Sequence, residues 1–402
     1  MLGSSSGGHD QQQEEQEDNL IQNRSSLNSP AIHMRQLLIT CAELISTNSD
    51  LSSAHRLLTI LLTNSTPYGD STERLVHQFA KSLSLRLNRN GNFGSSGSVQ
   101  SSNEAADLLQ SSYLSLNQIT PFIRFTQLTA NQAILDSIEG QQEGIHILDF
   151  NIMHGLQWPP FMQAIAERYP PLSLRITAAG TDSQILRRTG DRLSKFAHSL
   201  GLRFQFQPIL LVNEDDVVSV VVNNLLPGET LAVNFVLYLH RLLKDREKLG
   251  IFLHRIKSMN PKIVTVAERE ANHNHPLLLQ RFVEALDHYA AVFDSLEATL
   301  PPNSRERINV ETTWFGREIY DIVCGEGIER RERHERYRCW EMMMRSSGFS
   351  NVELSGFAFS QAKLLLRLHY PSEGYQLHTL NNHNSFFLGW QNQPLFSVSS
   401  WH

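Results

Sequence analysis

The chain has 402 residues, of which 41% are hydrophobic and 19% charged, and this composition excludes a fibrous or a wholly disordered protein. Its net charge is −6, so the chain has no overall basic field that would attract DNA over a distance. The apolar stretches are short, and the first residues lack a basic region followed by an apolar one, so we expect neither a membrane span nor a secretory signal. Three cysteines without metal-finger spacing (Cys41, Cys324 and Cys339) indicate a reducing compartment.

Residues 1–29 are predicted to be a disordered, acidic and polar tail. They are rich in Ser, Gly, Gln and Asn, and their few large apolar groups cannot offset the entropy of ordering the chain. Five acidic residues against Arg24 give the tail most of the negative charge, so the rest of the chain is close to neutral. This balance disfavours autonomous DNA binding and favours recruitment by other proteins.

Three amphipathic helices are predicted next, with no strand between them. The first begins at Ser29-Pro30, a plausible N-cap followed by proline at the first helical position. The second follows Asp50, and the third follows the capping signal Asp70-x-x-Glu73. Residues 88–103 are predicted to form a flexible surface loop, and helical patterns then continue through Tyr113 and from Pro121 to Ile138.

The sequence pattern changes at Gly144, after which short apolar runs alternate with helical segments. The runs begin about 30 residues apart, which is typical of repeated βαβ units; they are 145–150, 172–178, 202–206, 231–236 and 263–266. We therefore predict an α/β fold with a doubly wound, mostly parallel sheet. At the C-terminus, 361–370, 386–390 and 395–401 are predicted to add antiparallel strands, the topology of S-adenosylmethionine-dependent methyltransferases.

Polar residues follow the predicted strands at the edge where ligands bind in open α/β sheets. The candidate pocket residues are Asp149, His154, Gly155, Asp182, Asn234 and Glu268. Polar strand ends are also common where nothing binds. The loop Phe150-Asn151-Ile152-Met153-His154 has bulky side chains where a methyl-donor site needs glycines, which argues against methyl transfer. No catalytic residue, cofactor or metal site is predicted, and His273-x-His275 is expected to lie in a polar loop.

Two segments have the form L-x-x-L-L, which on a helix can fill a partner's groove. Their leucines are Leu58, Leu61 and Leu62, and Leu239, Leu242 and Leu243. Burial in the protein's own core is the competing interpretation, especially for the second segment, because each buried leucine contributes ~1.5–3 kcal/mol.

The charged run 329–338 alternates arginine with glutamate. Pairs at i,i+4, Glu329 with Arg333 and Glu332 with Arg336, predict a solvated helix face. A protein contact is the alternative, because arginines near Tyr337 and Trp340 suit an interface.

The chain resembles the GRAS family of plant transcriptional regulators over residues 30–402. Ile145-His146-Ile147-Leu148-Asp149 is similar to the family's V-H-I-I-D signature, within a region at about 104–180. Leucine-rich segments at 31–87 and about 189–221 flank it. Pro261 and Arg317-Glu318 resemble the P-F-Y-R-E region (about 230–324), and Trp340, Trp390 and Trp401 the S-A-W region (about 327–402).

This resemblance, most like the Lateral suppressor branch of scarecrow-like proteins, implies a methyltransferase-like Rossmann core with an α-helical cap. It also implies a nuclear, non-enzymatic regulator in plant development, with a role in axillary shoot meristem initiation. Its implied partners are DNA-binding factors, other transcription regulators and a homo- or hetero-dimer partner, while direct DNA contact is not favoured by the charge. The alternative is a methyltransferase or a small-molecule receptor that uses the strand-end pocket.

Overall fold

The computed structural model describes residues 30–90, 102–138, 143–168, 172–212, 228–380 and 384–402. The chain divides into two compact units, residues 1–96 and 97–402, and each is described by itself. The predicted tail at 1–29 lies outside the described residues, as does most of the predicted loop at 88–103. None of the helices in the described ranges is long and apolar enough to cross a bilayer.

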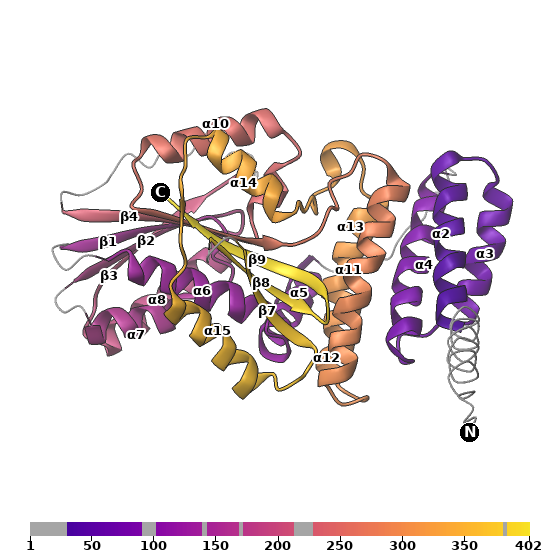
Figure 1. The fold of residues 1–402 in the computed structure, drawn as a ribbon, viewed down its shortest axis with the longest axis horizontal. Helices are drawn as coiled ribbons and strands as arrows, with labels where there is room; N and C mark the ends of the chain where they lie inside the picture. The colour runs from indigo at the N-terminus through magenta and orange to yellow at the C-terminus, as the bar shows by residue number, and fades with distance from the viewer. Residues whose placement is uncertain (1–29, 91–101, 139–142, 169–171, 213–227, 381–383) are drawn as a thin grey trace, which may run out of the picture. The chain divides into compact units, whose positions relative to one another are not determined.

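The first unit contains three helices, as the periodicity predicts (Figure 1). They are α2 (Pro30–Thr47), α3 (Leu51–Thr63) and α4 (Ser71–Asn90), so α4 continues through residues predicted to begin a loop. Side-chain caps fix where the second and third helices begin. The Asp50 carboxylate accepts a hydrogen bond from the Ser53 backbone N–H at 2.9 Å, and Asp70 accepts one from Glu73 at 2.9 Å.

The first L-x-x-L-L segment lies inside this unit and does not form a surface ridge. Leu58 and Leu61 are almost fully buried, and Leu62 is half-buried. They share the interior with apolar residues of the two neighbouring helices, such as Leu38, Cys41, Phe79 and Leu83. The apolar side chain that α3 exposes is Ile60, at 48%. The expectation of a leucine ridge open to a partner is therefore corrected, because these leucines face the core.

The second unit is built on one mixed sheet with strand order β3-β2-β1-β4-β5-β9-β8-β7, and β6 pairs with β9. The strands are β1 (Gly144–Asp149), β2 (Ser173–Gly180), β3 (Arg203–Leu210), β4 (Glu229–Val236), β5 (Ile263–Arg269), β6 (Asn351–Val352), β7 (Tyr375–Leu380), β8 (Ser385–Trp390) and β9 (Gln393–Trp401). The first five pair in parallel, and β9 inserts antiparallel between β5 and β8. This confirms the predicted methyltransferase-like topology.

Helices cover both faces of the sheet (Figure 1). One face carries α6 (Phe122–Asp136), α7 (Trp158–Arg168), α8 (Ser183–Ser199) and α15 (Gly356–His369), and the other carries α10 (Arg246–Ser258) and α14 (Tyr337–Ser346). The remaining helices are α5 (Ser102–Ile119), the short α9 (Leu239–Leu242), α11 (Leu278–Thr299), and α12 (Arg305–Asn309), which runs through a π-helical segment (Val310–Phe315) into α13 (Gly316–Cys324).

The face under α10 and α14 holds a large aromatic and aliphatic cluster. Phe150, Phe235 and Phe252 pack ring against ring, with centroids 5.2–5.8 Å apart. Trp340 and Trp401 belong to the same cluster, and so do the leucines of the second L-x-x-L-L segment, Leu239, Leu242 and Leu243. These leucines are therefore core residues, which confirms the interpretation that they are buried in the protein's own core and do not form a partner-binding ridge.

The prediction of a strand at 361–370 is wrong, because this stretch belongs to helix α15. Its run of leucines resembles a strand, but Ala358 and Ala362 are buried at helical spacing and the Ser355 hydroxyl caps the first turn. The missing strand is β7, which follows Gly374. A Cβ at Gly374 would lie 2.3 Å from the Trp390 ring, so only glycine permits this close approach.

We expect Leu61→Ala to destabilise the first unit by about 2–5 kcal/mol, because it leaves a cavity among three helices. Ile60→Ala, one residue away, should cost little because Ile60 is half exposed. Hydrogen exchange of the α3 amides in the full chain measures both effects. Equal protection in the two variants would contradict the placement of Leu61 in the core.

Candidate functional site

A cavity of about 290 Å³ lies at the carboxyl edge of the sheet. Residues after β1 and β4 and at the end of β5 line it, including Asn151, Leu237 and Arg269, and residues of the segment 314–334 line it as well. This is where the strand order reverses between β1 and β4, the usual ligand position in doubly wound sheets. The position agrees with the predicted pocket, although the residues that form it differ.

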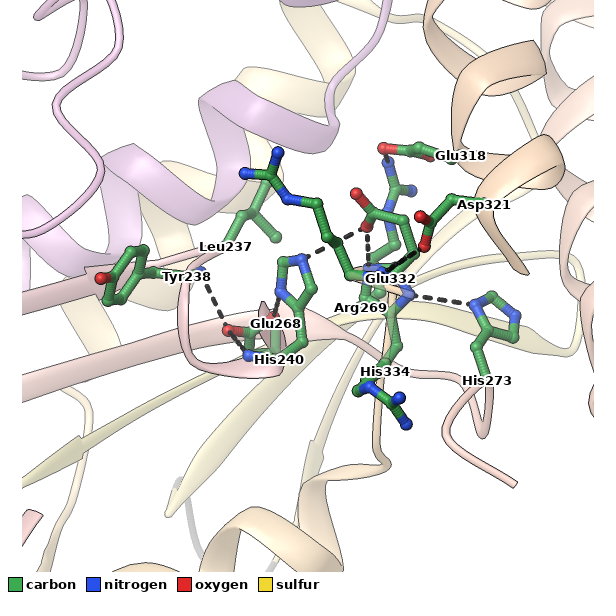
Figure 2. Close-up of polar contacts among 12 residues, drawn as sticks. Leu237, Tyr238, His240, Glu268, Arg269, His273, Glu318, Asp321, Glu332 and His334 are labelled. Atoms are coloured by element: carbon green, nitrogen blue, oxygen red, sulfur yellow. Dashed lines mark hydrogen bonds and ion pairs between the residues drawn. The ribbon is translucent and has the colours of Figure 1, made fainter. Parts of the chain in front are cut away.

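Glu268, at the end of β5, holds the chain after β4 in place (Figure 2). Its Oε1 accepts hydrogen bonds from the backbone N–H groups of Tyr238 at 3.0 Å and His240 at 3.3 Å. Its Oε2 lies 2.7 Å from His240 Nδ1. The neighbouring Leu237 has φ +54°, a left-handed conformation that leucine seldom adopts, and these contacts maintain it.

Glu332 continues this chain of contacts on the other side of His240 (Figure 2). Its Oε2 lies 3.3 Å from His240 Nε2 and 3.3 Å from His334 Nε2. His334 Nδ1 in turn lies 3.0 Å from His273 Nδ1, so one of these two nitrogens donates to the other. Segments distant in the sequence thus meet in one buried chain, Glu268–His240–Glu332–His334–His273, which we call the histidine–glutamate chain.

Burial and neighbouring charges set the protonation of this chain. Burial alone would lower the pKa of His240, but Glu268 and Glu332 outweigh it and raise the pKa to about 9. Burial alone would raise the pKa of Glu332, but the hydrogen bond and charge of His240 lower it to about 2. Burial lowers the pKa of His273 to about 3 and that of His334 well below its usual value. One imidazolium therefore lies between two carboxylates, and neutral imidazoles extend the chain.

Arg269 forms a second buried pair beside this chain. Its Nη2 donates to Glu318 at 2.7 Å, and the Tyr289 hydroxyl donates to the other oxygen of Glu318 at 2.8 Å. The guanidinium carbon lies 4.9 Å from the Phe396 ring centre and 5.6 Å from that of Phe315. Arg269 Nη1 has no hydrogen-bond partner among the described residues. Arg317, the other half of the Arg317-Glu318 motif, is exposed and lines the cavity.

The charged run does not form the predicted solvated helix, because α14 begins only at Tyr337. Asp321 Oδ2 accepts the backbone N–H groups of Arg331 and Glu332 at 2.8 and 2.7 Å. Arg330 is buried and donates to the His273 carbonyl at 2.9 Å. Surface i,i+4 pairs contribute only ~0.2–0.5 kcal/mol, so the buried contacts decide the conformation.

None of the six pocket residues predicted from the sequence lines this cavity in the described part of the chain. Asp149 is buried, and its oxygens accept the Asn151 backbone N–H at 3.0 Å and the Trp158 ring N–H at 2.8 Å. Burial raises the pKa of Asp149 to about 6 despite these bonds. Asn234 exchanges hydrogen bonds with Gln157 at 3.1 Å inside the core. Glu268 faces His240 and the backbone, as described above.

The other three lie nearby. Asp182 caps α8 by accepting the backbone N–H groups of Gln184 and Ile185. His154 and Asp182 line a smaller hollow of about 140 Å³, and Gly155 adopts φ +62° between them in sequence. The acids at the first two strand ends thus hold backbone and ring donors of the protein itself.

The remaining motif residues serve the scaffold. Ile145, His146, Ile147 and Leu148 are buried in β1, where His146 Nε2 contacts the Thr177 hydroxyl at 2.8 Å. Pro261 is buried just before β5. Trp390 donates its ring N–H to Asp294 at 2.6 Å, while Trp340 donates to the Glu335 carbonyl at 2.9 Å.

Sequence reasoning missed the polar residues that matter most here: His240, Arg269, Trp314, Glu332 and His334. In the sequence, His240 stands at a variable position of a leucine motif, and Glu332 and His334 stand within the charged run. The available signal was the combination of an acid at the end of β5 with a histidine just after β4, because parallel strand ends meet at one edge.

His240, Glu332 and His334 offer three ligand atoms within 4.8 Å of one another, the residue types of a metal site. The two imidazole rings stack, however, with centroids 4.3 Å apart and an angle of 28° between their planes. Both Nε2 atoms already lie 3.3 Å from the same oxygen, Oε2 of Glu332. The arginines Arg241, Arg269 and Arg331 also line this cavity and oppose a cation. The arrangement favours a hydrogen-bonded chain over metal coordination.

Comparison with known proteins gives matches over almost the whole chain. The model of the GRAS domain family matches residues 34–402. Scarecrow-like protein 18 of Arabidopsis thaliana is 52% identical, over 92% of this chain and 91% of its own length. Protein MONOCULM 1 of Oryza sativa subsp. japonica is 42% identical, over 91% of this chain and 88% of its own. The crystal structure of SCL7 in Oryza sativa superposes with a TM-score of 0.79 at 35% identity, covering 93% of this chain and all of that one.

The raised pKa of His240 predicts how stability depends on pH. Since the folded pKa of about 9 exceeds the ordinary value of 6.5, the stabilisation is complete below pH 6.5 and is lost as pH rises through about 9. The loss is on the order of 3 kcal/mol. Urea unfolding at both ends of this pH range should show the loss of stability in the native chain and not in His240→Gln.

His254→Gln, at an exposed position on α10, is the matched control and should keep the native slope. A slope that survives in His240→Gln would contradict an imidazolium at this position.

Proposed function

Because the chain belongs to the GRAS domain family, whose members regulate plant development, we propose that it is a nuclear transcriptional regulator that acts through protein contacts. The observation that carries this proposal is the family match over residues 34–402, together with relatives 52% and 42% identical over nearly their whole lengths. The proposed partners are DNA-binding factors, other transcription regulators and a second regulator subunit. The near-neutral charge of residues beyond the tail supports recruitment to DNA over direct contact.

The similarity to MONOCULM 1 and the likeness to the Lateral suppressor branch support a role in axillary shoot meristem initiation. Inactivation of the gene should then reduce axillary shoots. Unchanged branching, in a plant with no second copy, would count against this role.

We further propose that the chain does not catalyse methyl transfer. A methyl-donor site needs backbone amides exposed by glycines and a free acid after the first strands. Here Phe150, Ile152 and Met153 occupy the first loop, and the Asp149 carboxylate is committed to protein donors on both oxygens. Asp182 caps a helix and Glu268 holds His240, so the acids of the rival enzyme proposal are all engaged.

This predicts no binding of S-adenosylmethionine or its demethylated product in calorimetric titration at millimolar concentration. The methyl donor would find no free carboxylate to accept hydrogen bonds from its ribose. It would also find no exposed backbone amides to bind its own carboxylate, so it would lose the contacts that such sites supply. Micromolar binding of either compound would overturn the non-enzymatic proposal.

The surface proposed for protein contacts is the exposed surface of the first unit. Large apolar side chains there include Tyr68 at 74% exposure, Ile60 at 48% and Ile32 at 44%. Single exposed apolar residues are common on protein surfaces, so a substitution is needed to distinguish a contact residue from an ordinary surface residue. Substitution of Leu58 or Leu61 would be uninformative, since both lie in the core.

Ile60→Asp should leave the chain folded and weaken self-association and binding to a partner regulator by at least about tenfold, the effect of charging an apolar contact. Light scattering gives the assembly state, and titration with a purified partner gives the affinity. Ile251→Asp, equally exposed on α10 of the second unit, is the matched control. If both variants behave as the native chain does, the first unit is not the interface.

A further inference from the structure

We propose that the cavity at the carboxyl edge of the sheet binds a small organic anion, a carboxylate carried on an apolar body. Arg269, Trp314 and Arg317 would hold the carboxylate, and the side chains after β1 and on α6 and α8 would hold the body. This inference goes beyond the proposed function and does not depend on it, because it concerns binding alone.

The cavity has the size and position of a ligand site. Its 290 Å³ equals the volume of about ten water molecules at ~30 Å³ each, which leaves room for roughly a dozen non-hydrogen atoms. It lies entirely within the second unit, at the reversal of strand order. Ligands of doubly wound sheets bind at this place because strand ends and loops converge there.

The charges around the cavity favour an anion. Four arginines line it, Arg241, Arg269, Arg317 and Arg331, together with the imidazolium of His240. Among the described residues, the carboxylates that line it are Glu318 and Glu332. Glu332 is paired with His240, and Glu318 with one nitrogen of Arg269, so the excess charge is positive. In a partly enclosed space this excess attracts an anion more strongly than it would in open water.

Two buried donors point to the same ligand. Arg269 is 2% exposed, yet its Nη1 has no hydrogen-bond partner among the described residues, and the ring N–H of Trp314 is likewise unpartnered and buried. Both side chains line the cavity. Buried donors without acceptors are rare because each has lost its water without compensation. The oxygens of one carboxylate can accept from both donors.

The π-helical segment Val310–Phe315 explains how these donors come together. It is inserted between α12 and α13, and it carries Trp314 one turn before Arg317 and Glu318. Such segments often occur at functional sites because they shift side chains out of the regular helical register. The Trp314 ring packs against Tyr113, with ring centroids 5.4 Å apart, which holds its ring nitrogen in place.

Part of the cavity wall is apolar, and this part selects the body of the ligand. Tyr113, Ile123, Ile152, Met153, Ile185 and Leu237 line it. Met153 has φ +45° and Leu237 has φ +54°, so two apolar side chains are held at the wall in a conformation that costs energy. A bare inorganic anion would leave this wall uncovered, whereas an aromatic or aliphatic carboxylate would cover it.

Calorimetric titration of the full chain with 1-naphthoate, an apolar carboxylate of suitable size, tests the proposal. We expect a micromolar dissociation constant and a rise in melting temperature on binding. The neutral isostere 1-naphthamide should bind at least about tenfold more weakly, the effect of losing a charge-assisted contact. Inorganic phosphate, which lacks an apolar body, should also bind more weakly.

Arg317→Gln removes an exposed cationic side chain at the cavity and should weaken 1-naphthoate binding about tenfold without unfolding the chain. Trp314→Phe keeps an aromatic ring and removes only the N–H, and it should weaken binding severalfold. Arg338→Gln, exposed on α14 and outside the cavity lining, is the matched control and should bind as the native chain does.

Three results would overturn the proposal: no binding of 1-naphthoate by the folded native chain, equal affinity for 1-naphthamide, or native affinity in both Arg317→Gln and Trp314→Phe. Phosphate binding as tight as that of 1-naphthoate would overturn the apolar part of the site.

Discussion

An imidazolium buried between two carboxylates organises the carboxyl edge of this protein. Glu268 and Glu332 flank His240 and raise its pKa, and the charge and hydrogen bond of His240 in turn lower the pKa of Glu332. Removal of any one member would leave an uncompensated charge in the interior, which is costly. Through this coupling the end of β5, the turn after β4 and the segment 330–336 are held together, and the cavity beside them keeps its shape.

Much of the fold could be predicted from the sequence because it follows from local rules. Asp50 and Asp70 cap helices where the pattern indicates, and the apolar runs at 27- to 32-residue spacing are the five parallel strands. The strand predicted at 361–370 is a helix because three adjacent leucines obscured the spacing of Ala358 and Ala362. Local patterns predict secondary structure least reliably where an apolar run is short, because such a run fits both the helical and the strand periodicity.

The position of the candidate site could be predicted from the sequence, but the residues that form it could not. The positions of the strand ends predicted the correct edge of the sheet. Asp149 and Asn234, however, turn toward donors within the protein, and other residues line the cavity. Glu332 and Arg330 looked like members of a solvated helix because sequence spacing shows surface pairs and does not show burial. Their partners, His240 and the His273 carbonyl, are far away along the chain, so only tertiary structure reveals them.

The same edge explains how a methyltransferase-like scaffold suits a regulator. Side chains such as Met153 replace the glycine cradle of a methyl donor, while cationic and apolar walls enclose the cavity that remains. The first unit is a compact body whose leucines form its own core. The surface proposed for protein contacts and the cavity proposed for a ligand therefore belong to different units of the chain.

The most direct test of this account is nitrogen NMR of the histidine rings, because ring nitrogen shifts report each tautomer and its protonation. We expect His240 to keep protons on both ring nitrogens until about pH 9 and to lose this behaviour in Glu332→Gln. A His240 ring that is neutral at pH 7, or one whose titration is unaffected by Glu332→Gln, would contradict it.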